Sequence, residues 1–79
     1  MLEIDKDGNR FWKNEKDELH RVEGPAIEWS DGEKCWYRNE WLHRIDGPAI
    51  EYRSGTKEWY ENDQLHRIDG PAVEWALVS

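Results

Sequence analysis

Short segments in which apolar and polar residues alternate recur along the chain. Residues 26–29 read Ala-Ile-Glu-Trp, residues 49–52 Ala-Ile-Glu-Tyr, and residues 72–75 Ala-Val-Glu-Trp. Successive side chains of a strand point to opposite sides of a sheet, so Ala and Glu are expected on one face. The other face is expected to carry the pairs Ile27 with Trp29, Ile50 with Tyr52, and Val73 with Trp75. No window keeps the 3.6-residue period of a helix. The pattern therefore predicts short β-strands.

Turn sequences separate these segments. Ser30-Asp31-Gly32 and Arg53-Ser54-Gly55 form one set, and Asn39-Glu40 and Asn62-Asp63 form another. A Gly-Pro pair precedes each segment, which places proline at the start of a strand, where its missing N–H does least harm. The simplest arrangement is an all-β fold, an antiparallel meander of about seven short strands. We expect these strands near residues 2–5, 10–14, 25–29, 34–38, 48–52, 57–61 and 71–75.

The same residues return every 23 positions, which is the signature of a repeat protein. Leu-His-Arg begins at Leu19, Leu42 and Leu65, and Gly-Pro-Ala begins at Gly24, Gly47 and Gly70. A tryptophan precedes each copy, at Trp12, Trp36 and Trp59, with one extra residue in the first copy. We therefore expect one repeat domain over residues 1–79. It comprises a capping strand in residues 1–8 and units at about residues 9–31, 32–54 and 55–77.

The 23-residue period, the aromatic-x-Asn turn and the x-x-Gly hairpins resemble the MORN-type repeat. The Leu-His-Arg-x-Asp-Gly-Pro-Ala variant resembles repeats in small uncharacterised proteins of bacteriophages and prophages. The resemblance runs from about Gly8 to Trp75 and implies a single sheet. The chain departs from the usual MORN pattern at Glu40 and Asp63, where glycine usually follows the turn asparagine. The lipid binding associated with MORN repeats is not expected here, because the chain lacks a basic surface.

The charge of the chain narrows the range of partners. It has 18 acidic and 11 basic side chains and a formal net charge of -7. Direct binding to nucleic acid or to an anionic membrane is therefore not expected, since both need a basic footprint. The expected partner is a protein or nucleoprotein complex with a basic surface. A single cysteine and the lack of a signal-peptide pattern favour the cytoplasm, here of a bacterial host cell.

Side chains that could carry chemistry recur in every unit, unlike those of an active site. His20, His43 and His66 should lie ~9–10 Å apart, two strand spacings, which is too far to share a zinc ion with ligand distances of ~2.0–2.1 Å. Each histidine is expected to hydrogen-bond a turn in its own unit. Three pairs are expected to brace the Gly-Pro turns: Arg21 with Glu23, Arg44 with Asp46, and Arg67 with Asp69.

The sequence contains no nucleophile motif and no phosphate-binding loop. Cys35 is either a reactive thiol or, as is commoner in a strand, a small hydrophobic residue. We therefore predict no metal, no cofactor and no enzymatic activity.

Trp41 is the main candidate for partner binding. Its equivalents are Glu18 and Gln64, so the scaffold does not require an aromatic residue there. Tryptophan is enriched among interface hot spots, and a position in a turn favours exposure. Trp41 filling a local hydrophobic gap, and the acids forming a solvated face, are the alternatives. The other predicted contact residues are Tyr37, Arg38, Glu40, Glu61 and Asp63.

Two functions fit these observations. The first is a phage or prophage protein that binds and inhibits a bacterial defence complex, as an anti-CRISPR protein does. The second is a MORN-like scaffold that acts by self-association, for which a homodimer is the simplest form.

Overall fold

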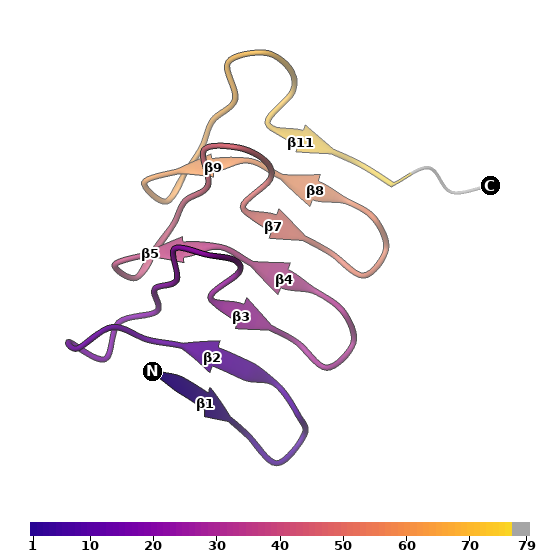
Figure 1. The fold of residues 1–79 in the computed structure, drawn as a ribbon. Helices are drawn as coiled ribbons and strands as arrows, with labels where there is room; N and C mark the ends of the chain where they lie inside the picture. The colour runs from indigo at the N-terminus through magenta and orange to yellow at the C-terminus, as the bar shows by residue number, and fades with distance from the viewer. Residues whose placement is uncertain (77–79) are drawn as a thin grey trace.

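The computed structural model describes residues 1–76 and confirms an all-β fold with strands in meander order. Seven strands form one antiparallel sheet in the order β1-β2-β3-β4-β7-β8-β11 (Figure 1). Within residues 1–76 there is no helix, and so none that could cross a membrane. The strands of this sheet are β1 (Leu2–Ile4), β2 (Arg10–Trp12), β3 (Ile27–Glu28), β4 (Lys34–Cys35), β7 (Ile50–Glu51), β8 (Lys57–Glu58) and β11 (Val73–Glu74).

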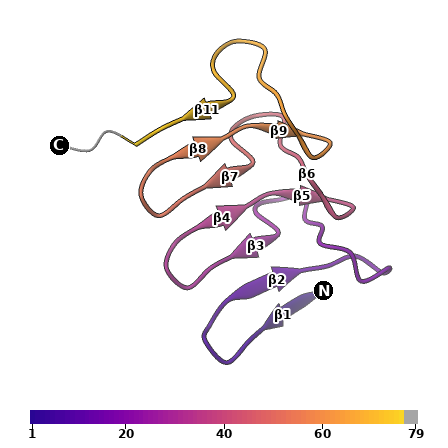
Figure 2. The same cartoon turned by 180° about the vertical axis from the view of Figure 1, so that it is seen from behind.

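The two segments expected as single strands at 34–38 and 57–61 are each divided in two. β5 (Tyr37–Arg38) pairs with β6 (Trp41–Leu42), and β9 (Tyr60–Glu61) pairs with β10 (Gln64–Leu65). These hairpins lie along one side of the seven-stranded sheet, and the x-x-Gly loops lie along the other (Figure 2). The expected strands at 10–14 and 25–29 are also shorter, at three and two residues.

A tryptophan lies between the two strands of each divided segment: Trp36 separates β4 from β5, and Trp59 separates β8 from β9. The N–H of Trp36 donates to the carbonyl of Ala49 in the seven-stranded sheet, at 2.7 Å. The carbonyl of Trp36 instead accepts from the N–H of His43, at 3.0 Å. Trp59 makes the same two bonds with Ala72 and His66. The two backbone groups of one residue thus serve different sheets, and the chain changes sheet there.

The Asn turns confirm the turn prediction. Asn39 and Glu40 have φ angles of 49° and 73°, and Asn62 and Asp63 have 50° and 68°. Two successive positive φ angles define the type I′ turn of a two-residue hairpin. Asparagine tolerates this conformation, whereas Glu40 and Asp63 lie where glycine would be free of strain.

One face of the sheet carries the apolar row. Cross-strand pairs join Phe11 to Ile27, Ile27 to Cys35, and Cys35 to Ile50. The rings of Phe11 and Trp29 meet edge to face at 5.7 Å, which agrees with Ile27 and Trp29 sharing a face. We call this the aromatic face. It comprises Phe11, Ile27, Trp29, Cys35, Ile50, Tyr52, Glu58 and Val73, with Trp75 continuing the alternation.

The buried core is thin. Ala26 and Ala49 are fully buried and Ile27 is 6% exposed, and no large side chain within residues 1–76 is completely buried. A single sheet has no second layer to cover its faces, so its side chains stay half-buried. Much of the stability must therefore come from side-chain stacking and polar pairs on the sheet surface.

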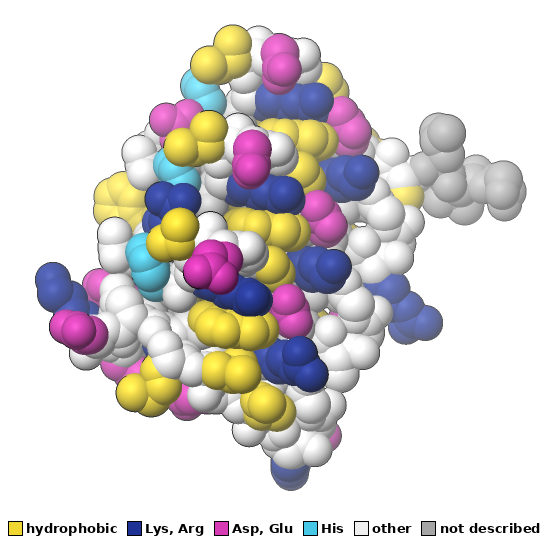
Figure 3. Space-filling view, in the orientation of Figure 1, with side chains coloured by type: hydrophobic (Ala, Val, Ile, Leu, Met, Phe, Trp, Pro, Cys, Tyr) yellow, Lys and Arg dark blue, Asp and Glu magenta, His cyan; other side chains and the backbone are white. Residues whose placement is uncertain are grey.

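The opposite face carries a column of stacked tryptophans and arginines. The Arg21 guanidinium carbon lies 3.7 Å from the centre of the Trp12 ring, and the Arg44–Trp36 and Arg67–Trp59 distances are both 3.8 Å. Figure 3 shows the resulting alternation of hydrophobic and basic side chains along this face. We call this the Trp–Arg face. Such cation–π contacts fix the guanidinium plane against the ring.

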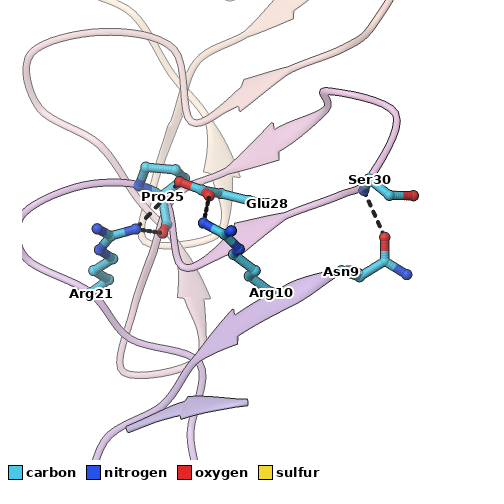
Figure 4. A network of polar contacts seen from close by, with 6 residues as sticks. All are labelled: Asn9, Arg10, Arg21, Pro25, Glu28 and Ser30. Atoms are coloured by element: carbon cyan, nitrogen blue, oxygen red, sulfur yellow. Dashed lines mark hydrogen bonds and ion pairs between the residues drawn. The ribbon is translucent and has the colours of Figure 1, made fainter. Parts of the chain in front are cut away.

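Each stacked arginine is held from a second direction. Arg21 Nη1 donates to the Pro25 carbonyl at 3.2 Å and pairs with Glu28 at 3.4 Å, while Arg10 approaches Glu28 from the neighbouring strand (Figure 4). The expected arginine–acid pairs form between Arg44 and Asp46 and between Arg67 and Asp69. The expected Arg21–Glu23 pair was wrong. Among residues 1–76 the acidic partner of Arg21 is Glu28, which lies across the Pro25 turn.

A ladder of alternating charge runs beside this column. Within this ladder, directly opposed residues on neighbouring strands carry opposite charges, an arrangement that stabilises a sheet. Charged residues that are interleaved along the sequence therefore help to hold the strands of the sheet together. In order along the sheet it contains Arg10, Glu28, Lys34, Glu51, Lys57 and Glu74.

Candidate functional site

Trp41 lies in β6 directly opposite Arg38 of β5, and its side chain is 54% exposed. Together they line a shallow hollow of about 460 Å³ with His20, Asn39, His43 and Asn62. The expected exposure of Trp41 is therefore confirmed, but its expected position in a turn was wrong, because Trp41 begins the strand that follows Asn39 and Glu40. The other residues of the hollow are all polar, so Trp41 does not fill a hydrophobic gap.

The two histidines that line this hollow also bind the Asn turns. His20 Nδ1 accepts the N–H of Asn39 at 3.0 Å, and His43 Nδ1 accepts the N–H of Asn62 at 3.2 Å. The expectation that each histidine bonds its own unit was wrong for these two, because the Asn turns stack along the sheet. Each imidazole reaches the turn of the following unit. These bonds help to set the position of the hairpin that carries Trp41 and of the hairpin that follows it.

The structure separates Tyr37 from Trp41. Tyr37 is half-buried and precedes Arg38 in β5, so the side chains of Tyr37 and Arg38 point to opposite sides of the hairpin. Trp41 is paired with Arg38 and therefore lies on the side away from Tyr37. Burial raises the pKa of Tyr37, and the nearby Cys35 and Asp63 add to the rise. The predicted cluster therefore divides into Arg38 with Trp41 on one side and Tyr37 on the other.

The three predicted acids occupy different surroundings. Glu40 is exposed in the turn beside Trp41. Asp63 Oδ1 accepts the N–H of Leu42 at 3.3 Å, which brings this carboxylate to the Trp41 hairpin. Glu61 lies in β9, one unit further on, with its carboxylate 3.4 Å from His66 Nε2. The structure thus gathers Glu40 and Asp63 near Trp41 and leaves Glu61 at the edge of this surface.

Sequence reasoning missed a polar cluster on the aromatic face. Glu58 stands in the apolar row, at the position of Phe11 and Cys35, and accepts both the Tyr52 hydroxyl at 3.2 Å and the Tyr60 hydroxyl at 2.9 Å. Burial raises the pKa of Tyr60 to about 12, and the bond to Glu58 contributes further. The phenols remain protonated donors near neutral pH. An acidic residue at an apolar repeat position was the available signal.

Exposed aliphatic residues form a second feature that was missed. Val22, Ile45 and Ile68 are 67%, 83% and 91% exposed and stand 23 residues apart. They project from the loops that follow the stacked arginines. Ile45 borders hollows of about 500 and 710 Å³ on either side of its loop. The sequence signal for this feature was an aliphatic residue that recurs in each unit between the arginine and the acidic residue.

The remaining candidates for chemistry were Cys35 and a metal site. Cys35 is paired between Ile27 and Ile50, and burial raises the pKa of its thiol, which favours the small-hydrophobe interpretation over a reactive thiolate. In the part of the chain that the structure describes, no three His, Cys, Asp or Glu side chains form a group able to hold a metal ion.

Instead of the expected single sheet, residues 1–76 form one seven-stranded sheet and two two-stranded hairpins, with an exposed tryptophan in a polar, acid-flanked hollow. Comparisons with protein-family models, curated proteins and solved structures found no match. The resemblance to MORN-type repeats stays a prediction.

Proposed function

We propose that this chain is a non-enzymatic protein-binding module with Trp41 as its anchor. The proposal rests on the exposure of Trp41. This residue is 54% exposed, and the other residues that line its hollow are all polar. Tryptophan at the centre of a contact contributes much of its binding energy when a partner excludes water from it. Arg38 and the two histidines that also line the hollow supply hydrogen-bonding groups beside the indole.

The proposed partner is a protein or nucleoprotein complex with a basic surface. Glu40 and Asp63 lie beside Trp41, Glu61 lies further along, and the chain carries a net charge of -7. Such rim charges mainly speed association and make it sensitive to salt. The phage-like repeat directs the proposal toward inhibition of a bacterial defence complex, as by an anti-CRISPR protein, in the bacterial cytoplasm.

The proposal is tested by isolating a partner from bacterial lysate and measuring binding kinetics at two salt concentrations. Trp41→Gln is the sharpest variant, because Gln64 occupies the equivalent position in the next hairpin. We expect Trp41→Gln to speed dissociation at least about tenfold. Removing the charges of Glu40, Glu61 and Asp63 together should slow association and flatten its salt dependence. An unchanged dissociation rate in folded Trp41→Gln would exclude Trp41 as the anchor.

Self-association is the second candidate, and β1 favours it. β1 is an edge strand of the seven-stranded sheet, and its Leu2 and Ile4 are 45% and 60% exposed. An exposed apolar edge strand can pair with the edge of another molecule. Light scattering should then show a dimer that Ile4→Lys converts to a monomer. A monomeric mass for the unaltered chain at high concentration would exclude this function.

A further inference from the structure

Three aromatic side chains form a row on the aromatic face, at the end of the strands away from Trp41. Trp29 follows β3, Tyr52 follows β7 and Trp75 follows β11. Trp29 is 38% exposed, Tyr52 is half-buried and Trp75 is 77% exposed. β4 lies between β3 and β7, and β8 lies between β7 and β11, so consecutive members are two strands apart. The row runs across the strands, along the axis of the repeat.

The spacing of this row matches one kind of peptide. Neighbouring strands lie ~4.7–4.9 Å apart, so the aromatic residues should repeat every ~9.4–9.8 Å. A polyproline II helix has three residues per turn and rises ~3.1 Å per residue, so the same side of it returns every ~9.3 Å. Aromatic-lined grooves are also the usual receptors for this helix. Two turns of such a peptide would reach from Trp29 to Trp75.

Acidic residues at one end of the row favour a basic residue at the end of the bound peptide. A hollow of about 690 Å³ beside Trp29 is lined by Asn9, Ser30 and three acids, Asp7, Asp31 and Glu33. An arginine placed there would stack on the indole and face these carboxylates. A second copy of this chain fits poorly, because it too carries a formal net charge of -7 and offers no excess of basic residues to these acids.

We propose that the row Trp29–Tyr52–Trp75 binds a proline-rich segment in the polyproline II conformation. The segment has proline at every third position and an arginine that enters the acidic hollow beside Trp29. This surface lies at the opposite end of the strands from the Trp41 hollow, and the proposal does not depend on the function assigned to Trp41.

The test is calorimetric titration of the full chain with a synthetic peptide of three Pro-Pro-Ala triplets that has arginine at each end. We expect saturable binding with one site per chain. A peptide with glycine in place of every proline should bind at least about tenfold more weakly, because it must be ordered on binding. A peptide with four-residue spacing and one with glutamate ends should also bind more weakly.

Variants of the protein locate the site. Trp75→Ala should lower the affinity for the peptide at least about tenfold, and its exposed side chain can be removed without disturbing the sheet. Trp41→Gln is the matched control and should leave peptide affinity unchanged, which separates this proposal from the proposed function. Absence of saturable binding, equal binding of the glycine peptide, or an unchanged affinity in Trp75→Ala would each overturn it. Self-association through this face without peptide binding would overturn it as well.

Discussion

A Cβ atom added to Gly47 would lie 2.8 Å from Cζ of Arg44. The guanidinium has little freedom to retreat, because it stacks on Trp36 at 3.8 Å and Arg44 Nη1 donates to the Pro48 carbonyl at 3.0 Å. Gly47 is therefore required by the close approach of the arginine. The corresponding distance is 3.3 Å at Gly24, so the fit is looser in the first unit.

This difference predicts unequal effects of one substitution. Gly47→Ala should lower the free energy of unfolding by ~1–3 kcal/mol through overpacking, and Gly24→Ala should cost clearly less. Both changes reduce the entropy of the unfolded chain alike, so their difference reports the clash with arginine. Urea denaturation of the two variants measures it. Equal losses would contradict the proposed role of the stacked arginine.

The histidine link between units predicts a loss of stability in a second pair of variants. His43→Leu removes the acceptor for the Asn62 N–H and should lower the free energy of unfolding by ~1 kcal/mol. His43→Asn can present an oxygen near the position of Nδ1 and should recover part of this loss. His66→Leu serves as the exposed control and should change stability by less than ~0.5 kcal/mol. Thermal denaturation separates these outcomes, and an equal effect at His66 would argue against the link.

The Asn turns predict a stabilising change. Glu40 has a φ angle of 73°, a conformation that costs a residue with a Cβ ~1–2 kcal/mol. Glu40→Gly should therefore raise the melting temperature. Asp63→Gly relieves similar strain but loses the bond to the Leu42 N–H, so its gain should be smaller. A larger gain at Asp63 would show that its carboxylate does not hold the neighbouring hairpin.

The Glu58 cluster predicts a loss of stability in alkali. The pKa of Tyr60 rises from 10.0 to about 12 in the folded chain, first because of burial and then because of Glu58. A raised folded pKa means that this stabilisation is complete below pH 10 and is lost as the pH rises toward 12. Denaturation across this range, with phenolate absorbance, follows the loss. Glu58→Gln should lower the Tyr60 midpoint, and an unchanged midpoint would assign the whole shift to burial.

The local features of the fold could be predicted from the sequence. Apolar–polar alternation in residues 26–29 and the turn residues Asn39 and Gly32 act over a few neighbours, so they indicate strands and hairpins without knowledge of distant contacts. The exposure of Trp41 was also predictable, because the other units carry Glu18 and Gln64 at its position. These features required only the comparison of one unit with the next.

The contacts that build the surfaces were decided by the tertiary structure. The stacking of Arg44 on Trp36, the bond from the Asn62 N–H to His43 and the separation of Tyr37 from Trp41 depend on which atoms meet when hairpins lie side by side. A repeat sequence shows that equivalent residues have equivalent neighbours, but not which neighbours these are. Residues 8 to 19 apart in the chain become partners only when the sheet sets the distance and direction between them.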